Sequence, residues 1–387
     1  MLDFNFYNPT KIIFGKSSLA ELPNLISNEY KKVMILYGGG SVKRFGTLDK
    51  VKDLLKNHEV IEFGGIEANP QYETLMKAIE IVKSEKVDFL IALGGGSVMD
   101  GTKFVSLGAH YPEDPAELFI NEMEANKKTT TAIPLGTIVT LPATGSEMNR
   151  GGVICYKDAK LSFHNDLAFP KFSIINPELT FTLPDKQVAN GIVDTFIHVC
   201  EQYITYPVSG AFQDRTAEGI LKTLIEVGRK TLDDKEDYEL RANLVWCATM
   251  ALNGLIGSGV PQDWSCHMIG HELTAKFNID HARTLAVVLP NLWRVRKKEK
   301  FDKLLQYATR VWNITEGTDD EKIEMAIQKT EEFFESLDIK LRLRDYNVDK
   351  NRLIEIKHSL EEYNKTALSE TKTLTPDIAL EILEKSY

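Results

Sequence analysis

The stretch Phe89-Leu-Ile-Ala-Leu93, followed directly by Gly94-Gly-Gly-Ser97, decides the fold class of this chain. A run of apolar residues without polar alternation is typical of a strand buried on both faces, as in a parallel sheet covered by helices. The same pattern occurs earlier, where Val33-Met-Ile-Leu-Tyr37 runs into Gly38-Gly-Gly-Ser41. Two buried strands that each end in a glycine turn predict an α/β fold with a parallel sheet.

The rest of the chain divides into two parts with different patterns. Residues 59–63 and 130–134 are expected to be strands, and apolar residues at helical spacing predict helices over 48–55 and 72–84. Beyond about Leu183, helical periodicity replaces the strand pattern. The helices predicted there span 187–205, 211–231, 238–256, 264–275, 301–312, 319–336 and 349–363. We therefore expect an α/β nucleotide-binding domain over residues 1–180 and an all-helical domain over residues 181–387.

The composition excludes several classes of protein. The chain has 387 residues, of which 43% are hydrophobic and 26% are charged, as in globular proteins of two or three domains. A net charge of -10 without a long basic run argues against nucleic acid or an anionic membrane surface as a partner. The four cysteines form no C-x-x-C pair, and neither a signal-peptide pattern nor an 18-residue apolar run occurs. We therefore expect a cytoplasmic protein.

The two glycine turns predict an anion site. Glycines between a buried strand and a helix let backbone N–H groups approach a phosphate closely, and the helix N-terminus adds partial positive charge. The G-x-G-x-x-G fingerprint is not matched, because Lys43 and Met99 stand where its last glycine would be. A phosphate-bearing ligand and a tight turn without a ligand therefore both remain as interpretations of each turn taken alone.

A group of acid and histidine residues indicates a metal site. Asp194 and His198 are four residues apart, as are His267 and His271, so each pair shares one face of its helix. His281 follows in a segment expected to be a loop. A divalent metal needs about four nitrogen or oxygen donors at roughly 2.0 to 2.2 Å, which two helices and one loop can supply. Hydrogen-bonded core histidines are the alternative interpretation.

The motifs in their order along the chain resemble those of the iron-containing, or group III, alcohol dehydrogenases. These motifs are Gly94-Gly-Gly-Ser-Val-Met-Asp100, Thr144-Gly-Ser-Glu147, Asp194-x3-His198, His267-x3-His271 and the distal His281. The resemblance covers nearly the whole chain, and the segment His267-Met-Ile-Gly-His-Glu-Leu-Thr274 is most similar to NADPH-dependent aldehyde reductases and butanol dehydrogenases.

The resemblance implies roles for individual residues. The implied ligands of a divalent metal, Fe²⁺ or Zn²⁺, are Asp194, His198, His267 and His281. His271 lies nearby as a catalytic residue that relays a proton. The implied cofactor-binding residues are Gly38, Gly39, Gly40 and Ser41 near the adenosine ribose, Gly95, Gly96 and Ser97 at the pyrophosphate, Asp100 holding the loop, and Thr137, Thr140 and Lys160 along the rest of the cofactor.

The first glycine turn favours NADP(H) as the cofactor. Relatives that prefer NAD have an aspartate where this chain has Gly39, and that carboxylate would repel a 2′-phosphate. Lys43 and Arg44 stand close by in the sequence and are expected to attract the phosphate.

The resemblance implies an oxidoreductase that transfers hydride reversibly from NADPH to a small aldehyde and gives a primary alcohol. It also implies a homodimer. Two alternatives remain: a lyase of the dehydroquinate synthase type, which uses its nicotinamide cofactor transiently, and a non-catalytic nucleotide-binding or metal-sensing protein. The lyase should show a cluster of basic residues beside the metal, whereas only Lys276 and Arg283 stand near His267 in the sequence.

Overall fold

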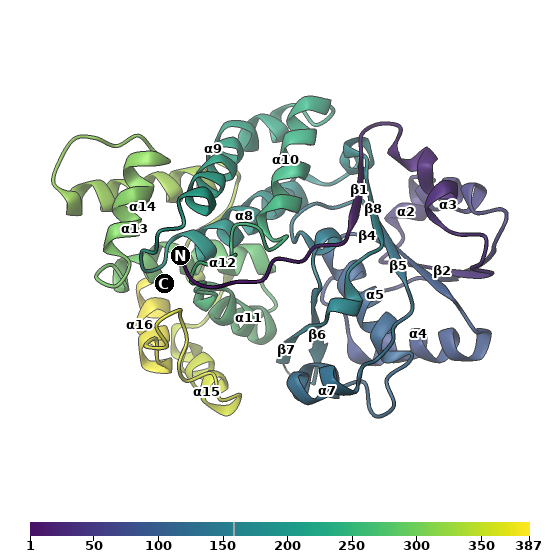
Figure 1. Cartoon of the computed structure of the whole chain (residues 1–387). Coiled ribbons are helices and arrows are strands. Elements are labelled where there is room, and N and C mark those ends of the chain that lie inside the picture. The colour runs from purple at the N-terminus through teal and green to yellow at the C-terminus, as the bar shows by residue number, and fades with distance from the viewer. Residues whose placement is uncertain (158) are drawn as a thin grey trace. The chain divides into compact units, whose positions relative to one another are not determined.

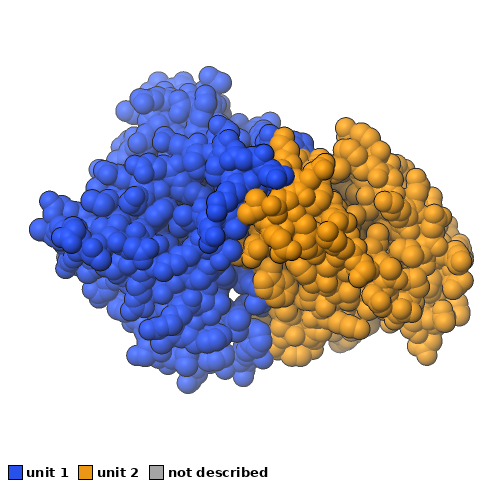
Figure 2. All heavy atoms as spheres, turned by 90° about the horizontal axis from the view of Figure 1, so that it is seen from above, with its two compact units in different colours: residues 1–6, 184–234, 250–387 blue, residues 7–183, 235–249 orange. Residues whose placement is uncertain are grey.

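A computed structural model describes residues 1–157 and 159–387, which form two compact units. The sheet unit comprises residues 7–183 and 235–249, and the helical unit comprises residues 1–6, 184–234 and 250–387. Figure 2 shows the sheet unit in orange and the helical unit in blue.

The sheet unit is built on six parallel strands. They are β1 (Lys11–Phe14), β2 (Lys32–Tyr37), β3 (Glu59–Phe63), β4 (Phe89–Gly94), β5 (Leu135–Val139) and β8 (Phe172–Ile175). Their order across the sheet is β1-β8-β5-β4-β2-β3, and every neighbouring pair is parallel. A separate antiparallel pair is formed by β6 (Gly151–Tyr156) and β7 (Ala159–His164). The predicted parallel sheet is confirmed.

The lack of polar alternation in β2 and β4 follows from helices on both faces of the sheet. Met34 and Leu90 belong to one apolar core, which the helices α4 and α5 complete. Ile35 and Ile91, which are paired across the two strands, belong to a second core with residues of α3. Because each strand is buried on both sides, both alternate sets of side chains must be apolar.

The helices of the sheet unit are α1 (Leu22–Leu25), α2 (Ser41–Arg44), α3 (Thr47–Leu54), α4 (Tyr72–Glu85), α5 (Gly96–Gly108), α6 (Glu117–Ile120), α7 (Glu122–Lys128) and most of α10 (Tyr238–Ala251). One strand prediction is wrong: residues 130–134 are not a strand, and β5 begins at Leu135. Thr130 and Thr131 are exposed, whereas all five residues of β5 are buried and pair with β4, and residues 136–138 also pair with β8. Pro134 precedes the strand because it has no N–H to donate to a sheet neighbour.

The helical unit contains no strand within its described residues, in agreement with the prediction (Figure 1). Its helices are α8 (Asp185–Tyr203), α9 (Ala211–Asp233), α11 (Ser265–Phe277), α12 (His281–Val295), α13 (Phe301–Arg310), α14 (Asp319–Ser336), α15 (Ile354–Glu362) and α16 (Pro376–Lys385). The sequence analysis did not foresee α12 and α16. Pro290 lies inside α12, and an internal proline is usually a sign against a helix.

The division of the chain differs from a single boundary after residue 180. The chain passes from the sheet unit to the helical unit at residue 184, but residues 235–249 return to the sheet unit. There, Arg241 of α10 donates from Nη1 to the backbone oxygen of Thr180 at 3.2 Å, and the ring of Trp246 packs edge-on against Phe14. Among the described residues, no helix combines the length and apolarity needed to cross a bilayer.

Candidate metal centre and cofactor site

Three helices of the helical unit carry the predicted metal donors. α12 packs against both α8 and α11. Asp194 and His198 lie one turn apart on α8, and their side chains are buried. His267 and His271 are likewise one turn apart on α11 and buried, while His281 is half-buried.

The sequence analysis expected His281 in a loop, but the structure places it in a helix. It is the first residue of α12, where the helix begins after the extended residue Asp280. A side chain in the first turn of a helix is held by the rigid element that follows it. All predicted donors therefore lie on helices.

The predicted donor atoms converge on one oxygen, Oδ1 of Asp194. The Nε2 atoms of His198, His267 and His281 lie 3.7, 3.6 and 3.9 Å from it. The ligand atoms of Asp194, His267 and His281 all lie within 4.8 Å of one another. Bonds of about 2.0 to 2.2 Å around a tetrahedral ion would separate neighbouring ligands by about 3.3 to 3.6 Å. The spacing is therefore close to that of a metal site.

Two buried atoms of the cluster fit a bound cation. Within the described residues, Asp194 Oδ1 and His267 Nε2 have no hydrogen-bond partner. Buried polar atoms without partners are rare and costly, and a divalent ion would satisfy both. Three imidazoles and one carboxylate are donors that suit Fe²⁺ or Zn²⁺. The residues present therefore fit the metal.

The electrostatics of the cluster favour positive charge. Burial alone would raise the pKa of Asp194, but His198, His267 and His281 hold it well below its usual range. Burial alone would lower the pKa of His267, yet the carboxylates of Glu201 and Asp194 raise it to about 9. The two carboxylates therefore attract positive charge to this point, and a metal ion would replace the proton of His267.

His271, the predicted proton relay, and Trp264 lie beside the donors. The ring of His271 lies with its centroid 4.8 Å from that of His281 and 6.1 Å from that of His267. Trp264, at the start of α11, packs edge-on against His267 at 5.5 Å and against His198 at 6.2 Å. The structure thus places His271 and an aromatic side chain beside the donor cluster.

The second glycine turn lies at the end of β4, where α5 begins. Gly95 is the N-cap residue and Gly96 the first helical residue. A Cβ on Gly96 would come within 2.5 Å of the Thr144 side chain, and one on Gly95 within 2.9 Å of Leu141. These glycines are therefore required by their packing against the loop that follows β5, whether or not a phosphate binds. The hydroxyl of Ser97 donates to the backbone oxygen of Ala68.

The first glycine turn has more space around it. Gly38 follows β2, and a Cβ on Gly39 or Gly40 would meet no atom within 4 Å. Gly40 has φ 95° and precedes the short helix that begins at Ser41. Nζ of the exposed Lys43 in that helix lies 3.2 Å from the carboxylate of Glu62, which is half-buried.

The remaining predicted cofactor residues differ in their surroundings. Thr137 is fully buried in β5, and its hydroxyl donates to Ser173 at 2.7 Å, so it belongs to the core of the sheet. Thr140 is half-buried where β5 ends, and its N–H donates to the Gly94 oxygen at 2.9 Å. Lys160 on β7 donates to Asn69 at 3.0 Å.

Asp100 belongs to a buried network that the sequence analysis did not foresee. Its carboxylate accepts hydrogen bonds from Ser146 Oγ at 2.7 Å and from the N–H of Val153 at 3.0 Å. One turn later on α5, buried Lys103 donates to Ser146 at 2.9 Å and to Asn149 at 2.8 Å. Burial lowers the pKa of Lys103 to about 8. An acid and a lysine three residues apart on a helix that follows a glycine turn could have indicated this network.

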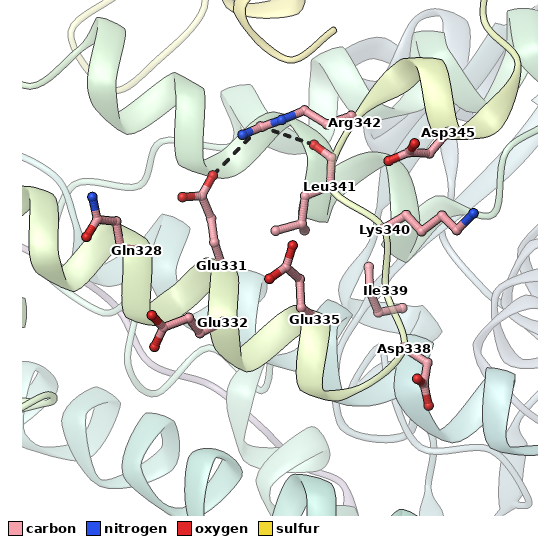
Figure 3. A pocket seen from close by; sticks show the side chains of 10 residues that line it. All are labelled: Gln328, Glu331, Glu332, Glu335, Asp338, Ile339, Lys340, Leu341, Arg342 and Asp345. Carbon is pink, nitrogen blue, oxygen red and sulfur yellow. Dashed lines mark hydrogen bonds and ion pairs between the residues drawn. The ribbon is translucent and has the colours of Figure 1, made fainter.

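A groove elsewhere in the helical unit contains none of the predicted site residues. It is formed by α14 and the segment after it and has a volume of about 700 Å³, and five of its ten lining residues are acidic (Figure 3). Two of its lining residues form an ion pair, in which Nη1 of Arg342 lies 3.8 Å from Oε1 of Glu331. Exposed acidic groups at such a groove are common without a ligand.

The sequence matches two family models that together cover most of the chain. The model "Iron-containing alcohol dehydrogenase" matches residues 9–177, and the model "Fe-containing alcohol dehydrogenase family, C-terminal" matches residues 188–387. The chain belongs to the iron-containing alcohol dehydrogenase family. The resemblance drawn from the motifs is confirmed, and membership of this alcohol dehydrogenase family makes the chain an oxidoreductase.

Relatives within the iron-containing alcohol dehydrogenase family span the full length of the chain. The NADPH-dependent aldehyde reductase YqhD of Escherichia coli is 52% identical over 99% of each chain, and a crystal structure of YqhD matches with a TM-score of 0.97 at 51% identity, covering 100% of this chain and 99% of that one. A structure of NADH-dependent butanol dehydrogenase A from Thermotoga maritima gives a TM-score of 0.94 at 32% identity, covering 100% and 99%. The NADH-dependent butanol dehydrogenase A of Clostridium acetobutylicum is 36% identical over 100% of both chains.

Proposed function

We propose that this chain is a metal-dependent reductase that transfers hydride from NADPH to a small aldehyde, giving a primary alcohol, and that also catalyses the reverse reaction. The convergence of three imidazole nitrogens on Asp194 Oδ1 carries the proposal. The 52% identity to a relative named as an NADPH-dependent aldehyde reductase supports the direction and the cofactor.

The proposed ligands are Asp194, His198, His267 and His281. When bound, the metal supplies Lewis acidity toward a carbonyl oxygen, and NADPH supplies the hydride. The chain's own part is to hold the donors on three packed helices, so that little reorganisation is needed during the reaction. His271, with its ring beside His281, would hold the proton that the product alcohol requires.

The cofactor choice rests on the first glycine turn. Gly39 presents no carboxylate to a 2′-phosphate, and Lys43 and Arg44 follow in the next helix. Ser41 and the glycines 38–40 would meet the adenosine ribose, while Gly95, Gly96 and Ser97 would meet the pyrophosphate. Asp100 would hold that turn through Ser146. Thr140 and Lys160 would line the rest of the cofactor. Thr137 would support β5, the strand that ends just before Thr140, from the core of the sheet.

A lyase of the dehydroquinate synthase type is not favoured. The relatives described above are named as reductases or dehydrogenases. Arg283, one of two basic residues near His267 in the sequence, lies 3.7 Å from the Asp280 carboxylate. A polyanionic substrate would therefore find this guanidinium beside a carboxylate of the protein.

The test is NADPH oxidation with butanal, followed by the loss of absorbance of the reduced nicotinamide. The protein is stripped with a chelator and reloaded with Fe²⁺ or Zn²⁺, and NADPH is compared with NADH. Metal-dependent consumption of NADPH is expected. A preference for NADH would keep the enzyme class but contradict the interpretation of Gly39, and no turnover with any metal or aldehyde would contradict the reductase.

We also propose that residues 1–180 serve nucleotide binding and residues 181–387 metal binding, and that the protein is a cytoplasmic homodimer. The four cysteines are free, which suits a reducing compartment.

In the helical unit, Met1, Leu2, Phe4 and Phe6 expose 46 to 61% of their surface, an apolar segment that a second copy could cover. Light scattering that gives the mass of one chain at micromolar concentration would contradict the dimer.

A further inference from the structure

Glu201 is a buried carboxylate beside the proposed metal donors. It lies on α8 one turn after His198 and two turns after Asp194, so the three side chains share one face of the helix. Only 2% of Glu201 is exposed. Its Oε2 contacts Nδ1 of His267, and its Oε1 accepts the backbone N–H of Cys266 at 2.7 Å.

The contact with His267 determines which ring nitrogen can bind a metal. A carboxylate that accepts the Nδ1 proton leaves the Nε2 lone pair for coordination. His267 Nε2 is the atom that lies 3.6 Å from Asp194 Oδ1. We propose that Glu201 is a positioning residue of the metal centre, which fixes the ring of His267 and adds a negative charge next to the donors.

Glu201 is itself held in place by the turn before α11. The N–H of Asp263 donates to the backbone oxygen of Glu201 at 2.8 Å. The Asp263 carboxylate accepts the N–H of Ser265 at 3.1 Å and lies 2.8 Å from Nζ of buried Lys300. The first N–H groups of α11 are therefore satisfied by two carboxylates, and one of these also contacts the metal donor.

The inference rests on the metal site of the proposed function, and it predicts a change in metal affinity that can be measured without an activity assay. Glu201→Gln keeps the shape of the side chain and removes its charge, while Glu201→Ala removes both. Glu218→Gln is the matched control, because Glu218 is also a buried acid of the helical unit, and its Oε1 accepts from the hydroxyl of Tyr203 at 2.9 Å. All variants are made in the full chain.

The measurements are the affinity for Co²⁺, by competition with a chelator, and the visible absorption of the Co²⁺-loaded protein. Loss of such a partner typically weakens metal binding about 10- to 100-fold. We expect about 10-fold weaker binding for Glu201→Gln and about 100-fold for Glu201→Ala, each with an altered Co²⁺ spectrum. Glu218→Gln should keep the wild-type affinity and spectrum.

The outcomes separate this inference from the proposed function. A Glu201→Gln variant with wild-type Co²⁺ affinity and spectrum would overturn the positioning role, even if its thermal stability fell. If Glu201→Ala does not fold, the glutamine variant alone decides. If Glu201→Gln weakens Co²⁺ binding but the wild type oxidises no NADPH with aldehydes, this inference stands and the proposed function is overturned. A wild type that binds none of Co²⁺, Fe²⁺ and Zn²⁺ overturns both.

Discussion

The indole of Trp264 packs edge-on against the imidazole of His267, with ring centroids 5.5 Å apart, from a backbone in the left-handed region at φ 62°. Bulky residues rarely adopt this conformation, and such strain is found mostly at functional sites. Trp264 is also the residue immediately before α11, so the chain enters that helix through the strained position. The tryptophan thus covers the proposed metal ligand at a cost in backbone energy.

The strain at Trp264 predicts an unusual order of stability. Trp264→Gly should be more stable than Trp264→Ala by about 1 kcal/mol, because glycine adopts positive φ without the left-handed penalty. Trp246 is the control, since it lies inside helix α10 and is also partly exposed. There, alanine should be more stable than glycine by about 1 kcal/mol. Urea unfolding of the four variants measures this, and the same order at both positions would contradict the strain.

Removal of a proposed metal ligand should abolish both metal binding and turnover. His267→Ala deletes the donor atom 3.6 Å from Asp194 Oδ1 and leaves that carboxylate with fewer cationic neighbours. We expect loss of bound metal and a decrease of roughly 1,000-fold or more in kcat/KM, since Lewis-acid stabilisation contributes several kcal/mol. His58→Ala, which alters a histidine that contacts the Tyr30 oxygen, is the control and should retain both. Elemental analysis and steady-state kinetics measure the two effects.

A carboxylate at the first glycine turn should change the cofactor preference. A Cβ at Gly39 meets no atom within 4 Å, so aspartate fits without a steric clash. Gly39→Asp should raise KM for NADPH by about 10- to 100-fold, the range of a lost interaction with a charged group, and should improve the use of NADH. Gly39→Asn has the same shape without the charge and should change KM for NADPH much less. Equal effects of the two substitutions would show that charge is not the cause.

The buried Lys103 should make stability depend on pH. Its pKa of about 8 in the folded protein lies below the ordinary value of 10.5, so the folded state releases this proton first as pH rises. Between about pH 8 and 10.5 the unfolded state therefore binds more protons, and this group increases the free energy of unfolding with pH by up to about 1.4 kcal/mol per unit. Lys103→Met should remove this contribution. The stability of the wild type relative to the variant, measured by urea unfolding, should rise across this window; a constant difference would refute the assignment.

The parts of the fold that were predicted correctly are those in which burial acts along the whole element. β2 and β4 are buried on both faces, so their apolar runs could be recognised without knowledge of their neighbours. The strand was expected over 130–134 because threonine has a high strand propensity, whereas β5 begins at Leu135. Propensity alone fails here because strand formation depends on which residues pair in the sheet. The helix α12 was missed because Pro290 lies within it.

The candidate site shows the same division. Asp194 and His198 could be paired from sequence, because four residues make one helical turn. Glu201 lies one turn further along the same face but was not singled out, since its importance depends on α11, a helix that is distant in the sequence. For Thr137, the resemblance implied contact with the cofactor, whereas the hydrogen bond to Ser173 depends on the register between β5 and β8.

The return of residues 235–249 to the sheet unit has a consequence for synthesis of the chain. While the ribosome is extending the protein, the sheet unit lacks α10 until residue 249 has emerged, although its last strand, β8, ends at Ile175. Buried Glu147, whose carboxylate accepts the hydroxyl of Thr249 at 2.6 Å, lacks that partner until then. A fragment that stops at residue 183 would therefore be an incomplete folding unit, and separate expression of the two halves would yield neither unit intact.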